Sequence, residues 1–348
     1  MHIWTETPME EIWNQLRYFA SSINVYNLLT GKIKSNRKFV WSESEHLMHH
    51  SREISSCIRQ ADEYFRASRS VGLATKPLLQ FYGAQALTKA VILANDNSLG
   101  LQKLRYHGLS TRPSTADSAL QDALRTYNED PSQWQFENEY AVTNNGVFLH
   151  LARIVEDGVP STGEVLKIID LLKIIPDMAK MYSIHYGEPS HCFYLYGKPR
   201  FSDDGYFSIS FSSRYTKDEL LEVFPEFLSG YRFTDENGIL SFRSLKPLSK
   251  EPRYGVLVKG AVAGSFYVRP HRTGIYKPIT VFYALMFILS NIVRYKPAFW
   301  MDIIDGRTTG SFAIAEATTH IFARHFPNEV LEYFWHEPFT FGTPGYIS

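Results

Sequence analysis

The segment from Pro77 to Leu93 constrains the fold more than any other part of the chain. Its apolar residues recur at helical spacing, and they occupy more than one face of the predicted helix. The main stripe comprises Leu79, Tyr82, Ala86, Ala90 and Leu93, and the neighbouring faces carry Leu78, Phe81 and Val91. A helix that is apolar on most of its faces must be covered by other elements. The segment therefore predicts a buried helix inside a sizeable core.

Further helices are predicted on both sides of this segment along the chain. Thr7-Pro8 supplies a helix start, and a second helix runs from Ser44 to about Phe65 with apolar residues at helical spacing. Near the C-terminus, helices are predicted over 278–295 and 310–335. The apolar run 279–293 is interrupted by polar residues and is shorter than the roughly 20 residues that a bilayer needs, which predicts a buried core helix.

The middle of the chain changes to the period of strands. Residues 206–212 alternate between apolar and serine positions, which is typical of a strand with one wet face. Two hairpins are predicted, 139–143 with 147–151 around Asn144-Asn145-Gly146, and 231–234 with 239–242 around Asn237-Gly238, because Asn-Gly favours tight hairpin turns. One helix is predicted in this region, over 163–182, with a kink at Pro176.

These patterns predict an α+β fold in which helical N- and C-terminal segments pack together around a strand-rich, antiparallel middle. We expect a single unit over 1–348, since no linker of low complexity separates its parts. Its subregions are 1–130, which is helical, 131–275, which is strand-rich with the one helix 163–182, and 276–348, which is helical.

Composition excludes some classes of protein. Lys plus Arg and Asp plus Glu both number 36, so there is no overall basic field to gather nucleic acid. Cys57 and Cys192 are too few for a disulfide framework, which favours a reducing cytosol. The N-terminus lacks the apolar region of a secretory signal, and we expect a cytoplasmic protein without a membrane partner.

Four segments carry a resemblance to a known family. They are 67–70 leading into Thr75–Ala90 (TKPLLQFYGAQALTKA), His107–Ser110 (HGLS), Leu171–Pro176 (LLKIIP), and Tyr283–Trp300, which ends in an Arg-Tyr-x-Pro-x-x-Trp pattern. In this order they resemble the YaaC-like family of bacterial proteins, over roughly residues 13–300. The resemblance implies a soluble prokaryotic protein of mixed α and β structure, and it carries no settled catalytic residues.

A basic cluster is the preferred candidate for a ligand site. Arg294 and Lys296 end the predicted C-terminal helix, where cations also act simply as a cap, and a cap is the favoured interpretation of these two residues. The functional alternative is an anion site in which Arg294 binds phosphate or carboxylate through its planar fork. Further members of that site are expected to be Arg66, Arg69, Lys76 and His107.

Other chemical motifs are weak or missing. His46, His49 and His50 fall on one face of a predicted helix, as metal ligands do, but an exposed polar face is the favoured interpretation because metal sites usually recruit ligands from a second element. Residues 259–265 lack the terminal Gly-Lys-Ser/Thr of a phosphate loop, so a glycine-bent strand pair is expected there. No pattern indicates a particular cofactor.

Two functions remain open from the sequence. The first is a cytosolic, non-catalytic binding or regulatory protein that acts through a protein interface, self-association or a small anionic ligand such as a nucleotide. The alternative is an enzyme or effector that acts on nucleotides or nucleic acid, for example in genome defence, with a basic pocket between the helices. The first is preferred because the charge is neutral and no catalytic motif occurs.

Overall fold

The computed structural model describes residues 2–342, apart from 36–43, 113–116, 157, 213, 250–255, 261–265, 270–276 and 308–309. The chain divides into two compact units. Unit 1 comprises Met1–Leu172 with Lys277–Pro344, and unit 2 comprises Lys173–Tyr276 with Gly345–Ser348. The expectation of a single unit over the whole chain stays a prediction.

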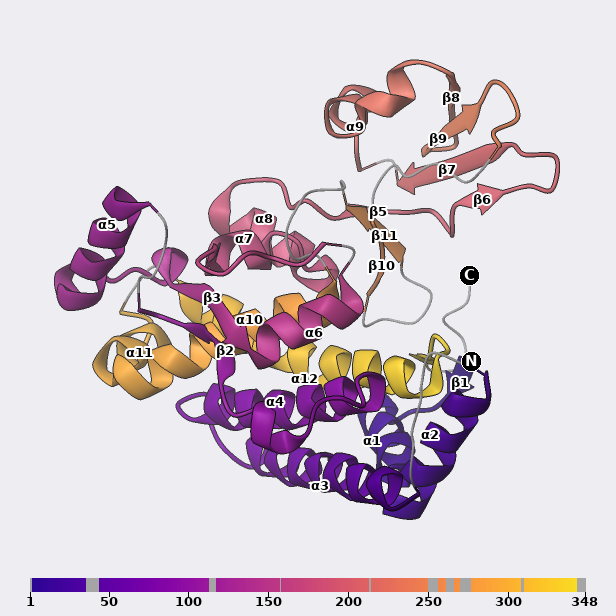
Figure 1. The fold of residues 1–348 in the computed structure, drawn as a ribbon. Helices are drawn as coiled ribbons and strands as arrows, with labels where there is room; N and C mark the ends of the chain where they lie inside the picture. Colours follow the sequence, from indigo (N-terminus) through magenta and orange to yellow (C-terminus); the bar gives the residue numbers. More distant parts are fainter. Residues whose placement is uncertain are drawn as a thin grey trace. The chain divides into compact units, whose positions relative to one another are not determined.

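Unit 1 is built mainly from helices contributed by both ends of the chain (Figure 1). Its helices are α1 (Pro8–Tyr18), α2 (Ser22–Ser35), α3 (Ser44–Arg69), α4 (Lys76–Asn95), α5 (Ser118–Glu129), α6 (Val147–Val155), α7 (Ile168–Leu172), α10 (Pro278–Tyr295), α11 (Pro297–Ile304) and α12 (Ser311–Trp335). Its strands are β1 (His2–Trp4), β2 (His107–Ser110), β3 (Tyr140–Gly146), β4 (Val165–Lys167) and β12 (Thr340–Gly342). Helices α3, α6, α10 and α12 all contact α4, so the predicted packing of N-terminal against C-terminal helices is confirmed.

Helix α4 is the buried centre that its sequence predicts. Phe81 is fully buried, and its ring lies 5.6 Å from Tyr283 and 5.5 Å from Phe287 of α10. Gly83 allows α3 to approach closely, because a Cβ there would lie 2.6 Å from the ring of Phe65. Gln80 donates a hydrogen bond of 3.0 Å to the carbonyl of Thr319 in α12. The helix is thus fixed to both ends of the chain.

Helix α10 is long and apolar enough to cross a membrane by length and composition, and within the described residues no other helix passes that test. Most of its residues are buried in unit 1, as in the core helix of a soluble protein. The predicted core helix over 278–295 is therefore confirmed.

The two small sheets of unit 1 differ in how their strands pair. Strand β3 pairs antiparallel with β2 and with β4, and this sheet positions residues of the site described below. Strands β1 and β12 pair in parallel and bring the two ends of the described chain together.

Unit 2 holds the remaining sheets. Its helices are α8 (Ala179–Tyr186) and α9 (Lys217–Val223), and its strands are β5 (Phe193–Tyr194), β6 (Arg200–Phe201), β7 (Phe207–Ser212), β8 (Tyr231–Glu236), β9 (Ile239–Ser244), β10 (Val256–Lys259) and β11 (Phe266–Arg269). Strands β6, β7, β9 and β8 form an antiparallel sheet in that order, and β10, β11 and β5 form another. The α+β class with an antiparallel middle is confirmed.

Two predictions for the middle region are wrong. Residues 147–151 are the start of α6 and not the second strand of a hairpin, because Asn145 does not adopt the positive φ that a tight Asn-Gly turn needs. The helix predicted over 163–182 is replaced by strand β4, the short helix α7, a 3-10 turn at Pro176–Met178 and α8. Pro176 lies after the end of α7 and begins the 3-10 turn, so it does not kink a helix.

The other predicted hairpin is confirmed. Asn237 and Gly238 have φ values of 53° and 77°, and they connect β8 to β9, with Glu236 opposite Ile239. The predicted strand over 206–212 is β7, with Phe207, Ile209 and Phe211 buried. The expected strand pair around 259–265 corresponds to β10 and β11, while 261–265 lie outside the described residues.

Candidate functional site

A pocket of about 430 Å³ opens on unit 1 where α5, the beginning of β3 and the end of α10 come together. Polar and aromatic side chains make up most of its wall. The lining residues are Thr111, Arg112, Arg125, Asn128, Glu129, Trp134, Glu139, Asn291, Tyr295 and Lys296. Its volume lies within the range of roughly 300–1,000 Å³ that small-molecule sites usually occupy.

A buried ion pair forms one wall of the pocket. Lys296 Nζ lies 2.6 Å from Glu139 Oε1, and the two side chains are 12% and 4% exposed. The same ammonium lies 4.6 Å from the ring centroids of Tyr127 and Trp134, within the range of cation–π attraction. Aromatic faces and a carboxylate together replace the water that this ammonium loses.

Glu139 has a second partner. The hydroxyl of Tyr127 lies 2.8 Å from Glu139 Oε1 and donates a hydrogen bond to it. Burial raises the pKa of Glu139, while the charge of Lys296 and the hydrogen bonds from Lys296 and Tyr127 act in the opposite direction. Burial and the nearby Glu139 carboxylate raise the pKa of Tyr127, so this hydroxyl remains a donor at neutral pH.

A second hydrogen-bond network holds the residues beside this pair in place. Asn128 Nδ2 donates to the carbonyl of Thr111 at 2.9 Å and to the hydroxyl of Tyr140 at 2.8 Å. Tyr140 is itself buried, which raises its pKa to about 12, and its hydroxyl lies 3.0 Å from the Thr111 carbonyl. Helix α5 is therefore fixed to β3 and to the segment that follows β2.

Other lining residues are more exposed to solvent than the ion pair, and two of them are arginines. Arg112 and Arg125 are both exposed, and Arg125 lies 3.7 Å from Asp122. Tyr295 is 68% exposed. With Lys296, the lining carries three cations against the two carboxylates of Glu129 and Glu139. This arrangement suits a ligand with a negative charge and a flat apolar part.

Arg294 lies next to the pocket without lining it, and His107 interacts with Arg294. Arg294 turns back along α10, where Nε donates to the Ser290 carbonyl at 3.1 Å and Nη2 lies 3.4 Å from Asn291 Oδ1. Asn291 lines the pocket, so Arg294 supports its wall. Burial lowers the pKa of His107, as do the charges of Arg294 and Lys89. Arg294 and His107 are thus close enough to interact electrostatically.

His107 is held on both sides. Its Nδ1 lies 2.7 Å from Gln85 Nε2 of α4, and its carbonyl accepts a hydrogen bond of 3.1 Å from the hydroxyl of Tyr283. The low pKa and the amide donor together favour a neutral imidazole that accepts at Nδ1.

The other three predicted anion-site residues have different surroundings. Arg66 pairs with Asp62 at 3.0 Å, and Arg17 contacts the same carboxylate at 3.0 Å. Arg69 is exposed at the end of α3, and Lys76 is half-buried at the start of α4. Over the residues that the structure describes, no hydrogen bond or ion pair links Arg66, Arg69 or Lys76 to the pocket. Of the six predicted residues, only Lys296 is in the described lining of the pocket, and Arg294 contacts the lining residue Asn291.

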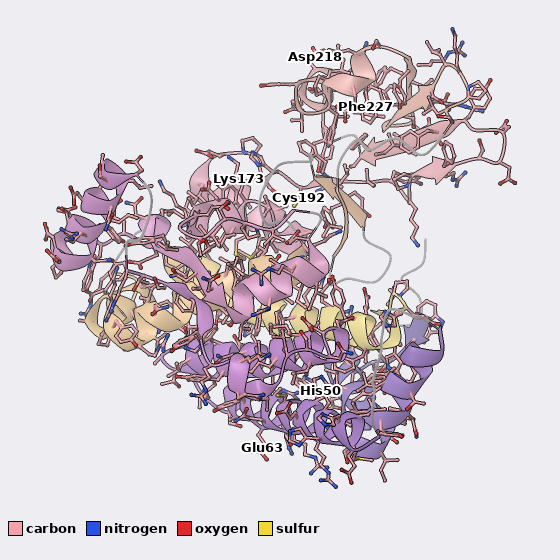
Figure 2. All side chains as sticks on the ribbon, in the orientation of Figure 1. His50, Glu63, Lys173, Cys192, Asp218 and Phe227 are labelled. Atoms are coloured by element: carbon pink, nitrogen blue, oxygen red, sulfur yellow. The ribbon has the colours of Figure 1, made fainter. Side chains whose placement is uncertain are left out.

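The histidine cluster lies on α3 as predicted, and its members have unequal surroundings. His50, labelled in Figure 2, is buried, with Nε2 2.6 Å from the Leu93 carbonyl. His46 and His49 are exposed. His49 Nε2 lies 3.6 Å from Glu53 Oε1. No group of three metal-ligating side chains occurs within the described part of the chain. Both cysteines are buried and neither forms a disulfide, and burial raises the pKa of Cys57 to about 12.

Sequence patterns missed several of the pocket residues. Glu139 is only the first residue of a predicted strand, and no motif singles out Tyr127 or Trp134. Nothing local marks them, since Lys296 meets Glu139 across 157 positions of sequence.

Comparisons with known proteins identify a family and no individual relative. A family model described as YaaC-like Protein matches residues 17–334, which is nearly the whole chain. No curated protein and no solved structure matches the chain.

Proposed function

The chain belongs to the YaaC-like family, and we propose that it is a cytosolic, non-catalytic binding or regulatory protein that recognises a small anionic ligand in the pocket of unit 1. The observation that carries this proposal is the pocket lining, which brings the exposed guanidinium groups of Arg112 and Arg125 together with the rings of Trp134 and Tyr295.

The chemistry of the pocket indicates the ligand class. Arg112 and Arg125 present guanidinium groups, which bind phosphate and carboxylate through two parallel hydrogen bonds. Trp134 and Tyr295 present aromatic rings that can stack on a planar group. A nucleoside monophosphate combines both features, and we take it as the model ligand.

The contacts of Glu139 and His107 favour binding without catalysis. Glu139 contacts both Lys296 and Tyr127, and the pocket lining contains no histidine or cysteine among the described residues. A general acid or base must be within hydrogen-bond reach of a substrate proton. His107, which interacts electrostatically with Arg294 beside the pocket, is engaged with Gln85.

The alternative is an enzyme or effector that acts on nucleotides or nucleic acid through one basic cleft. It receives less support, because Arg66 and Lys296 each form an ion pair with a carboxylate. His107 beside Arg294 is the feature that still favours it, since histidine is the side chain most often used for proton transfer in catalysis.

The test is calorimetric titration of the full chain with AMP, GMP, adenosine and inorganic phosphate. We expect a nucleoside monophosphate to bind more tightly than either adenosine or phosphate, because only it engages the guanidinium groups and the rings together. The double variant Arg112→Ser, Arg125→Ser should weaken that binding at least tenfold. Absence of binding by all four compounds would overturn the proposal.

A matched control removes two exposed arginines elsewhere in unit 1. Arg52 and Arg153 lie outside the pocket lining, so Arg52→Ser, Arg153→Ser should leave the affinity unchanged. If the control loses as much affinity as the pocket variant, binding reflects overall charge and not this site. A regulatory role also requires another protein or a second copy of this chain, and native mass spectrometry with and without the bound nucleotide would detect either.

A further inference from the structure

The sheet of β6, β7, β9 and β8 in unit 2 has one covered face and one open face. Side chains of one parity pack against α9 and the 3-10 turn Pro225–Leu228, in a cluster that includes Phe207, Phe242 and Phe227. Phe227, on the 3-10 turn, is labelled in Figure 2. Side chains of the other parity point away from this cluster, because successive residues of a strand face opposite sides.

Three arginines lie in one row across the open face. Cross-strand pairing places Arg200 opposite Ser208, Ser208 opposite Arg243, and Arg243 opposite Arg232. All three arginines are exposed. Like charges on directly opposite positions destabilise a sheet. A row of this kind therefore costs stability unless something negative binds to it.

The acidic residues of this part of unit 2 do not neutralise the row. Among the described residues, no carboxylate forms an ion pair with Arg200, Arg232 or Arg243. The charge of Arg243 lowers the pKa of Asp204, although less than the hydrogen bond from Ser202 does. Asp218 lies on α9, which covers the opposite face, whereas Glu236 lies on the open face, four residues along β8 from Arg232.

The need to protect sheet edges from pairing with other chains explains only some of the arginines in the row. Charged residues on edge strands prevent pairing with other chains, and Arg200 and Arg232 lie on the edge strands β6 and β8. Arg243 lies on β9, which is paired on both sides, so edge protection gives no reason for a cation there.

A shallow hydroxyl-rich depression adjoins the arginine row. It has a volume of about 360 Å³ and is lined by Tyr196, Gly197, Lys198, Arg200, Ser208, Ser210, Thr234, Glu236, Asn237, Ile239 and Ser241. Ser210 Oγ and Ser241 Oγ lie 2.8 Å apart on its floor. Tyr196 is 62% exposed, and the guanidinium of Arg243 stacks 5.2 Å from the ring of Tyr206.

We propose that this open face binds single-stranded nucleic acid, with the arginine row on the phosphates and Tyr196 on a base. Neighbouring strands are about 4.8 Å apart, so the row spans roughly 14 Å and can contact several phosphates of one strand. Exposed aromatic rings beside a basic surface are the usual means of binding single strands without reading their sequence. The binding does not depend on the pocket of unit 1 or on its ligand.

The test is fluorescence anisotropy of the full chain with labelled oligothymidylate and oligouridylate of about 20 nucleotides, over a range of salt concentrations. We expect binding that weakens with salt. The double variant Arg232→Ser, Arg243→Ser should bind about tenfold more weakly, with a salt slope that is shallower by about 0.7 for each phosphate that the variant no longer neutralises. Tyr196→Ala should weaken binding while leaving the salt slope unchanged, because it removes stacking and no charge.

A control variant removes the same charge from other faces of unit 2. Lys180 and Lys217 are exposed on α8 and α9, so Lys180→Ser, Lys217→Ser should retain the affinity of the parent chain. Equal losses of affinity in the two double variants would overturn the proposal, as would absence of binding by the parent chain at low salt. Circular dichroism of each variant would show that the sheet is still folded.

Discussion

Lys296 Nζ and Glu139 Oε1 lie 2.6 Å apart at the wall of the pocket, although 157 positions separate the two residues in sequence. The pair joins the end of α10 to the beginning of β3, and both side chains are nearly buried. Breaking a buried pair by removing one partner leaves an uncompensated charge and typically costs about 3–5 kcal/mol. We therefore expect Lys296→Met or Glu139→Leu alone to lower the free energy of unfolding by about that amount.

The double variant Glu139→Leu, Lys296→Met should cost clearly less than the sum of the single variants, because neither charge is then left alone. Denaturation of all four chains by urea would measure this coupling. Additive losses of stability would mean that the two groups do not depend on each other, and would contradict the pairing.

The hydroxyl of Tyr127 should contribute to the same wall. Tyr127→Phe keeps the ring beside Lys296 and removes the donor to Glu139 Oε1, which should cost about 1–3 kcal/mol. Tyr18→Phe is the matched control, since Tyr18 is 48% exposed and lies outside the pocket. Urea denaturation should show a loss of stability for Tyr127→Phe and almost none for the control.

Only part of this site could be predicted from sequence. Lys296 stands out because Pro297 follows it and because it ends a strongly apolar helix. Glu139 has no such local mark, and its meaning comes from the fold that brings β3 against the end of α10. Charge at a helix end is a local property, whereas the partner of that charge is decided by long-range packing.

The two Asn-Gly pairs show the same limit in the fold. Asn237-Gly238 makes the predicted turn because both residues adopt positive φ. At Asn145-Gly146, the glycine instead allows β3 to approach β2, since a Cβ on Gly146 would lie 2.6 Å from the Tyr106 carbonyl oxygen. Both uses need glycine, and only the surrounding structure separates them.

His107 should make stability depend on pH. Burial, Arg294 and Lys89 lower its folded-state pKa, so the unfolded chain binds the proton first as the pH falls below about 6.5. The contribution of this residue is therefore complete above that pH and is lost as the pH falls through the lower folded-state value. His107→Asn, which keeps an acceptor for Gln85, should flatten the decline in melting temperature between about pH 7 and pH 5.

The exposed His320 provides the comparison for this measurement. His320→Asn should leave the pH profile of the melting temperature close to that of the parent chain. A profile for His107→Asn that follows the parent chain would show that protonation of this imidazole is not linked to folding.

Gly83 should be intolerant of a methyl group. A Cβ at this position would lie 2.6 Å and 2.7 Å from two ring carbons of Phe65, where α3 packs on α4. Overpacking of this kind costs about 1–3 kcal/mol, and it outweighs the gain of about 1 kcal/mol that alanine brings to a helix interior. Gly31→Ala in α2 is the control, because no atom lies within 4 Å of its added Cβ and it should stabilise the chain. Thermal denaturation that ranks the two variants equally would contradict the tight packing.

The arginine row of unit 2 should reduce stability in the absence of a ligand. Arg232 and Arg243 are directly opposite on β8 and β9, and such a like-charge pair costs roughly 0.2–1 kcal/mol. Arg232→Ser should therefore raise the free energy of unfolding at low salt, and the gain should shrink as salt screens the repulsion. Arg232 is the better choice for this test, because Arg243 also stacks on Tyr206. Lys217→Ser on α9 has no like-charged partner opposite it and should show no such gain. A gain of stability in Arg232→Ser together with weaker nucleic-acid binding would indicate that the charge serves binding, whereas a loss of stability would show that the guanidinium stabilises the sheet itself.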